Sequence, residues 1–243
     1  MTPKFSIITV TRNNEEGLRA TLQSVAVQTN QDFELIVVDG HSTDGTAQTI
    51  QGFESTVARF EQDSGKGIYA AMNQGAAIAK GKWLIFMNAG DCFAHSNVLE
   101  TFAPAAETDL AFGRSYEPDG TPKSLFKGLD PIWLEMPFNH QAMFCKHSLF
   151  KQHPYDERLK ISGDFEFVLW SHRHGAKFEL LDLDVAIVEL GGISDRNYYP
   201  RCADWYRAAR RHHFWNWRMH LHYYKKVSWA RRMDQELTKS NES

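Results

Sequence analysis

Cysteine is scarce in this sequence, and long hydrophobic runs are absent from it. The three cysteines, Cys92, Cys145 and Cys202, are odd in number and follow no metal-ligand spacing. We interpret them as reduced thiols, which are typical of the cytoplasm. No run of about 18 apolar residues occurs, so a membrane-spanning helix is excluded, and no signal peptide precedes the first predicted strand. We therefore expect a cytoplasmic protein, either free or bound peripherally at the inner face of the cytoplasmic membrane.

The sequence also lacks an excess of either charge. Its formal net charge of −3 gives no reason to expect nucleic acid as a partner. The segment 201–232 differs, because it holds many arginines and lysines but a single acid, Asp204. Tryptophan and tyrosine lie among these cations, a mixture that is typical of a membrane surface. A pair of helices packed on a domain explains the same pattern, and the sequence leaves both interpretations open.

Short apolar runs alternate with helical patterns over the first part of the chain. Unbroken β-branched runs are typical of strands covered on both faces, so this alternation predicts an α/β fold with a mostly parallel, Rossmann-like central sheet flanked by helices. The predicted strands are Phe5–Val10, Phe33–Val38, Val57–Glu61 and Lys82–Met87. The predicted helices cover Leu18–Val25, Thr46–Phe53 and Ile68–Ala79, the first capped by Asn13 or Asn14.

The pattern is looser after residue 91. We expect strands at Leu110–Gly113, Ala142–Cys145, Lys177–Leu181 and Val185–Leu190, and a helix at Asp164–His174. Helical propensity dominates from Pro200 to Leu237. We divide the chain into a first domain, residues 1–197, and a basic, aromatic-rich helical extension, residues 198–243.

Two of the predicted strands end in acidic turns. Asp39 closes the second strand, and Asp91 lies in the turn after the fourth. Ligands of such sheets bind beyond the carboxyl ends of the strands. Asp39 can therefore accept a hydrogen bond from a base or ribose, and Asp91 can hold a divalent cation that carries a diphosphate. The plainer alternatives are a turn acid for Asp39 and, for Asp91, the cap of a helix beginning near Ser96.

A third acid, Asp164, stands where a helix is predicted to begin. A carboxylate there can act as a general base toward an attacking hydroxyl group. It can equally cap the helix, and spacing alone favours the cap.

Several segments occur in the order and spacing of the family 2 glycosyltransferases. They are Thr11-Arg12-Asn13, Val38-Asp39-Gly40 with Ser42-Thr43-Asp44-Gly45, Asn88-Ala89-Gly90-Asp91 and Ser162-Gly163-Asp164. Within this family the chain most resembles bacterial exopolysaccharide enzymes of the colanic acid type. The segments that carry this closer likeness are Gly67-Ile68-Tyr69-Ala70-Ala71-Met72-Asn73-Gln74-Gly75 and His140-Gln141. The resemblance extends from about Lys4 to Ser194.

The resemblance implies a GT-A fold, a nucleotide-diphosphate sugar donor, a divalent metal (Mn²⁺ or Mg²⁺) and inversion at the anomeric carbon. It also implies a saccharide or lipid-linked acceptor. Residue by residue, it assigns Asp39 to the nucleoside pocket, Asp91 to the metal and Asp164 to the role of catalytic base. The other residues it places at the donor site are Thr11, Arg12, Asp63 and Asn73. His140 and Gln141 are expected near the acceptor, with a purely structural histidine as the alternative.

Three positions depart from the family's pattern. Gly90 replaces one acid of the usual pair before the diphosphate, which predicts weaker metal binding. Ala70 replaces an acid of the subgroup, and Arg12 replaces the common tyrosine after the first strand.

Two other functions stay open on these grounds. A non-catalytic, degenerate transferase domain that serves as an assembly partner would explain Gly90 and Ala70. A sugar nucleotidyltransferase would also use a nucleotide-binding sheet and a metal. It would normally carry a glycine-rich, basic loop after the first strand, and Thr11-Arg12-Asn13-Asn14 is no such loop.

Overall fold

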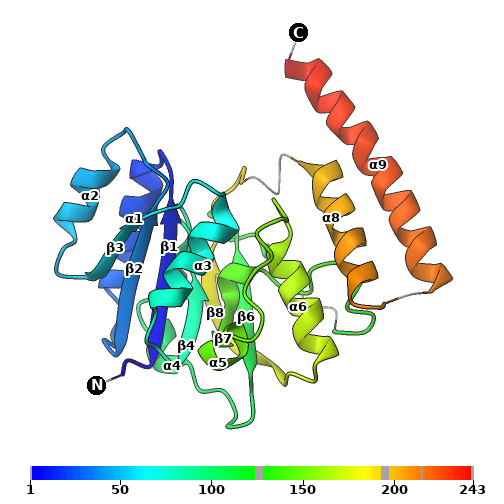
Figure 1. The fold of residues 1–243 in the computed structure, drawn as a ribbon. Helices are drawn as coiled ribbons and strands as arrows, with labels where there is room; N and C mark the ends of the chain where they lie inside the picture. The colour runs from blue at the N-terminus through cyan, green and yellow to red at the C-terminus, as the bar shows by residue number, and fades with distance from the viewer. Residues whose placement is uncertain (1, 124–127, 193–196, 215, 242–243) are drawn as a thin grey trace.

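A single mixed sheet forms the centre of the protein in the computed structural model, which describes residues 2–123, 128–192, 197–214 and 216–241. Within this part of the chain the sheet has eight strands in the order β3-β2-β1-β4-β7-β6-β8-β5 (Figure 1). The strands are β1 (Phe5–Thr11), β2 (Phe33–Asp39), β3 (Val57–Gln62), β4 (Trp83–Phe86), β5 (Cys92–Phe93), β6 (Leu110–Tyr116), β7 (Met143–Lys146) and β8 (Phe178–Ile187).

The predicted fold class is confirmed. Strands β1 to β4 pair in parallel, as their unbroken apolar runs indicate. Beyond β4 the sheet becomes mixed, since β7 runs antiparallel to both β4 and β6, while β6 and β8 are parallel.

The prediction of two late strands is wrong. Most of Lys177–Leu181 and the first part of Val185–Leu190 belong to one strand, β8, which runs through the polar segment between them and ends at Ile187. Asp182 and Asp184 resemble a turn in the sequence, but both carboxylates pair with Arg114 on β6. Irregular pairing between β6 and β8 around Arg114 accommodates this polar stretch within the sheet.

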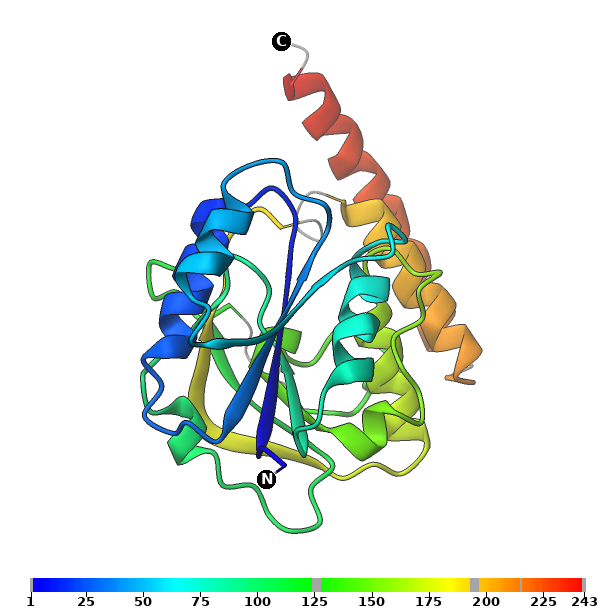
Figure 2. The ribbon, with the colours of Figure 1, turned by 60° about the vertical axis from the view of Figure 1, so that its left-hand side comes forward.

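Helices cover both faces of the sheet, and each face has its own apolar core. Alternate residues of a strand point to opposite faces, so Ile7 packs with α1 (Glu15–Ala26) while Ile8 packs with α3 (Ile68–Ile78). Figure 2 shows α1 and α2 (Thr46–Gly52) on one side of the sheet and α3 on the other. The Asn14 side chain caps α1 by accepting a hydrogen bond from the Gly17 amide, 3.1 Å away. Shorter elements are α4 (Val98–Thr101), η1 (His140–Ala142) and α5 (His147–Phe150).

The C-terminal extension consists of two helices packed on the sheet domain. Helix α8 (Tyr198–Arg211) lies against α6 (Gly163–Arg173), and α9 (Trp217–Asn241) lies against α8 (Figure 1). The Trp205 ring packs 5.2 Å from that of Phe165, and buried Tyr223 donates to the Trp133 carbonyl at 2.5 Å. Part of the aromatic content is therefore core. No helix in the described residues is both long and apolar enough to cross a membrane.

A buried carboxylate, Glu166, joins α6 to this extension. His153 Nε2 lies 2.9 Å from one oxygen of Glu166, and His212 Nε2 of the turn after α8 lies 2.7 Å from the other. Burial alone would raise the pKa of Glu166, but these two hydrogen bonds outweigh it and hold the pKa at about 2. Arg211 adds a positive charge 3.4 Å away. The folded state therefore favours the ionised form.

Glu166→Gln is expected to lower the free energy of unfolding by roughly 2 kcal/mol at neutral pH, since one buried imidazole loses its charged acceptor. The folded pKa lies below the ordinary value of 4.5, so the stabilisation is complete above that pH and is lost as pH falls toward about 2. Urea unfolding at about pH 5 and about pH 3 should show the gap between parent and variant shrinking. Asp182→Asn, whose carboxylate is 94% exposed, is the control. A constant gap would contradict the assignment.

Candidate active site

The carboxyl ends of β1, β2 and β4 meet at one edge of the sheet. Thr11 pairs with Asp39 at the ends of β1 and β2, and the Ala89 amide donates to the Val10 carbonyl at 3.0 Å. Asp39 and the turn 88–91 therefore lie on either side of the end of β1, about 10 Å apart at two strand spacings. This is the edge where ligands of parallel sheets bind.

Asp39 is 5% exposed and serves first as a turn acid. Its carboxylate accepts hydrogen bonds from the Ser42 amide at 3.0 Å and the Ser42 hydroxyl at 2.5 Å. The Asp63 amide donates to the Asp39 carbonyl at 2.9 Å, which brings the loop after β3 beside the end of β2. Arg12 extends its aliphatic stem over Gly40, where an added Cβ would lie 3.1 Å from that of Arg12. The structure thus groups Thr11, Arg12, Asp39 and Asp63.

Asp91 is also 5% exposed, and its two oxygens contact two distant segments. One accepts from Gln141 Nε2 and the other from the Glu189 amide, each at 3.1 Å. Burial raises the pKa of Asp91 to about 6, against the effects of His140 and of these hydrogen bonds. The cap alternative fails, because α4 begins only at Val98 and is preceded by Asn97.

Asp164 lies in the first turn of α6, where Ser162 and not Asp164 occupies the cap position. One oxygen accepts from the Phe165 amide at 2.9 Å and lies 3.1 Å from the Tyr69 hydroxyl. The other lies 3.1 Å from His140 Nδ1. The carboxylate is 15% exposed, so it is held by three groups and still reaches solvent.

Two adjacent residues of η1 join the second and third acids. Gln141 contacts Asp91, and His140 contacts Asp164, although these acids are 73 positions apart in the chain. The other ring nitrogen of His140 lies 3.3 Å from Asn88 Nδ2. Burial would lower the pKa of His140, but the hydrogen bond and charge of Asp164 and the charge of Asp91 raise it overall. The pair 140–141 therefore fixes the spacing between the two acids.

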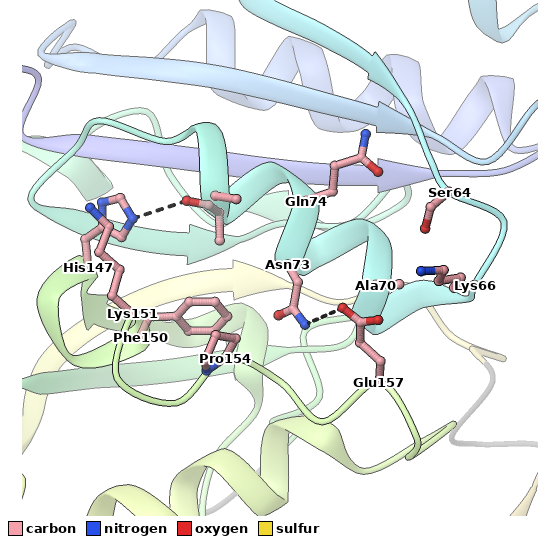
Figure 3. Close-up of a pocket in the computed structure, with 12 residues that line it drawn as sticks. Ser64, Lys66, Ala70, Asn73, Gln74, His147, Phe150, Lys151, Pro154 and Glu157 are labelled. Atoms are coloured by element: carbon pink, nitrogen blue, oxygen red, sulfur yellow. Dashed lines mark hydrogen bonds between the residues drawn. The ribbon is translucent and has the colours of Figure 1, made fainter.

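Asn73 does not join this group. Its amide donates to the Tyr155 carbonyl at 2.8 Å and to Glu157 at 3.1 Å. It lines a hollow of about 460 Å³ between α3 and the segment 147–157, and Figure 3 shows its side chain turned toward Glu157. Ser64 and Lys66, at one end of this hollow, belong to the loop that carries Asp63.

The sequence did not single out three neighbours of the acids. Asn88 Oδ1 is buried without a hydrogen-bond partner in the described part of the chain, and Tyr69 contacts Asp164. Glu189 follows β8 and contacts the turn 88–91. Asn88 and Tyr69 lie within segments that carry the family resemblance, and that position is a usable signal. Glu189 lies in no such segment.

Comparison with known sequences identifies relatives over most of the chain. Residues 6–155 match the profile of Glycosyl transferase family 2. A PGL/p-HBAD biosynthesis glycosyltransferase of Mycobacterium bovis is 34% identical over 179 residues, which cover 68% of each chain. A poly(ribitol-phosphate) beta-glucosyltransferase of Bacillus spizizenii is 28% identical over 140 residues, 53% of this chain and 22% of that protein.

Solved structures share the fold. TarS 1-349 of S. aureus in complex with UDP-GlcNAc has a TM-score of 0.71 at 23% identity and covers 86% of this chain, which spans 65% of that fragment. Glucosyl-3-phosphoglycerate synthase of Mycobacterium tuberculosis, with Mn²⁺, UDP and phosphoglyceric acid, has a TM-score of 0.62 at 13% identity, with 87% and 79% of the two chains covered. On the profile match and the mycobacterial relative, the chain belongs to glycosyl transferase family 2.

Proposed function

We propose that this protein is an inverting, metal-dependent glycosyltransferase. It moves a sugar from a nucleotide-diphosphate donor to a saccharide or lipid-linked acceptor in the synthesis of cell-surface polysaccharide. The observation that carries the proposal is the bridge at η1, where His140 and Gln141 bind Asp164 and Asp91 at the ligand-binding edge of the sheet. The names of the mycobacterial and Bacillus relatives support a glycan or glycolipid product.

The nucleoside of the donor would lie against the group formed by Asp39, Asp63 and Arg12. Both oxygens of the Asp39 carboxylate accept from Ser42, and each keeps a lone pair for a ribose or base donor. The UDP-GlcNAc and UDP complexes of the structural neighbours support a nucleotide-sugar donor for this fold.

The residues around Asp91 fit a divalent cation. Each Asp91 oxygen accepts one hydrogen bond, which leaves lone pairs on both. Asn88 Oδ1 is buried without a partner among the described residues, so a second hard oxygen is available. Carboxylate and amide oxygens suit Mg²⁺ and Mn²⁺. When bound, such a cation supplies electrostatic stabilisation to a departing diphosphate.

The Asp164 carboxylate would accept the proton of the attacking acceptor hydroxyl. The acceptor oxygen forms a bond to the anomeric carbon as the bond from that carbon to the diphosphate oxygen breaks, and the electron pair leaves with the nucleoside diphosphate. Attack from the opposite face inverts the configuration. His140 acts as a positioning residue, because its ring holds one Asp164 oxygen and its other nitrogen contacts Asn88.

The two other functions explain the site less well. A nucleotidyltransferase would need a phosphate loop after β1, but Asn13 and Asn14 there bind the neighbouring loop and cap α1. A degenerate domain would not need a buried carboxylate, Asp91, joined through η1 to the partly buried His140 and Asp164 at one edge of the sheet, since burial of charge is costly.

Asp164→Asn should reduce transfer by at least about 100-fold, because the amide cannot accept the hydroxyl proton. Its amide keeps the size of the carboxylate, so affinity for the nucleoside diphosphate should be unchanged by calorimetry. Asp182→Asn removes an exposed acid from β8 and should behave like the parent enzyme. The base assignment is wrong if Asp164→Asn turns over at the parental rate.

Asp91→Ala should abolish the gain in UDP affinity that Mn²⁺ provides to the parent, since the variant loses the cation's central carboxylate. Calorimetric titration with UDP, with and without Mn²⁺, measures this gain. Thermal unfolding without metal should show that the variant remains folded. Equal gains in the two proteins would count against the metal role of Asp91.

The outer face of α9 is a candidate membrane surface. Trp217, Leu221 and Tyr224 follow one another at helical spacing and are 70%, 46% and 74% exposed. The exposed cations Arg218 and Lys225 lie beside them. Large apolar groups flanked by cations suit an anionic lipid surface. We include this contact in the proposal, because a lipid-linked acceptor would be presented there.

The double variant Trp217→Ser/Tyr224→Ser should lower binding to vesicles of phosphatidylcholine and phosphatidylglycerol by roughly fivefold or more. Co-sedimentation measures the bound fraction, and pure phosphatidylcholine should bind all proteins weakly. Leu180→Ser removes a similarly exposed apolar side chain from β8 and serves as the control. Unchanged binding of the double variant to anionic vesicles would rule out this surface.

A further inference from the structure

The space above Gly90 is filled by the carboxylate of a distant residue. Gly90 has a φ of +104°, and a Cβ built on it would lie 1.8 Å from Glu189 Oε2. The carboxylate of Glu189 therefore stands where any side chain of residue 90 would begin. The family resemblance predicts an acid at position 90. The Glu189 carboxylate therefore lies where the side chain of that acid would begin.

Glu189 is tied to the turn 88–91 through both its backbone and its side chain. Its amide donates to Asp91 Oδ1 at 3.1 Å. Its Oε2 accepts from Asn14 Nδ2 at 3.3 Å, and the same nitrogen lies 3.2 Å from the Ala89 carbonyl. Asn14 is itself fixed as the cap of α1. The position of Glu189 is thus set by its own strand end and by the start of α1.

We propose that Glu189 supplies the second carboxylate of the metal site, in place of the acid that Gly90 lacks. This inference rests on the metal-dependent function proposed above. Glu189 is far in the sequence from the usual acid pair, since it follows β8 and lies 99 residues beyond Gly90.

The chemistry of Glu189 suits this role. Its Oε2 has one side-chain contact, with the Asn14 amide, and Glu189 is exposed while Asp91 is buried. A hard divalent cation selects oxygen ligands by position and charge, whichever segment provides them. Asp91 and Glu189 together carry two negative charges, which balance one divalent cation. Gly90 is then required at its position, because a side chain there would displace the Glu189 carboxylate.

The test is direct measurement of Mn²⁺ binding by electron paramagnetic resonance, in the presence and absence of UDP. Glu189→Gln keeps the size of the side chain and its contact with Asn14 but removes the charge. Its Mn²⁺ dissociation constant should rise by about tenfold or more relative to the parent. Asp182→Asn removes one charge from β8 and should leave the constant unchanged. UDP affinity without metal should be the same in all three proteins.

Each alternative result has a separate meaning. Parental Mn²⁺ affinity in Glu189→Gln overturns the role of Glu189 and leaves the proposed function intact. An equal loss of UDP affinity with and without metal also overturns it, since Glu189 would then act on the nucleotide. Failure of the parent protein itself to bind Mn²⁺, with or without UDP, removes the metal from the proposed function and Glu189 with it.

Discussion

The site depends on how the buried carboxylate of Asp91 and the partly buried carboxylate of Asp164 are held near each other. Asp91 and Asp164 carry like charges, and burial of a charge without partners costs several kcal/mol. The adjacent residues His140 and Gln141 reduce the cost of burial, because each binds one acid. The peptide between them also sets the separation of the two like charges. Burial still raises the pKa of Asp91 to about 6, so the hydrogen bonds and the charge of His140 offset only part of the cost of burying this carboxylate. A cation would find that carboxylate already in place.

The C-terminal extension also helps to place Asp164, because it contacts helix α6. Asp164 and Glu166 are two positions apart on α6, and they bind partners on different elements. His140 holds Asp164 from the sheet side, while His212 holds Glu166 from the end of α8. Helix α6 is therefore fixed by charged contacts on two sides of its first turns. The extension thus has a structural part in placing Asp164, whatever its outer face binds.

The sequence predicts some parts of this arrangement for physical reasons and misses others. Strands β1 to β4 follow from unbroken apolar runs, and acids at the ends of β2 and β4 must lie at the same edge of the sheet because parallel strands end there. The single strand β8 was missed because its polar residues pair with Arg114 on a neighbouring strand, a contact that no local pattern reveals. The bridge at η1 could not be predicted for a similar reason. Gln141 contacts an acid 50 positions before it, and His140 contacts an acid 24 positions after it.

The proposed role of Glu189 would explain how a motif can lose a residue without the site losing a charge. A motif records which position along the chain carries a ligand, whereas a cation responds only to the oxygen atoms around it. Gly90 removes a carboxylate from the turn and, having no Cβ, leaves the space that the Glu189 carboxylate occupies. Gly90 and Glu189 thus explain each other. Without Glu189, Asp91 would be the sole acid near the turn. With a larger residue at position 90, the Glu189 carboxylate could not occupy its present place. The departure from the family pattern at Gly90 is therefore weak support for a degenerate, inactive domain.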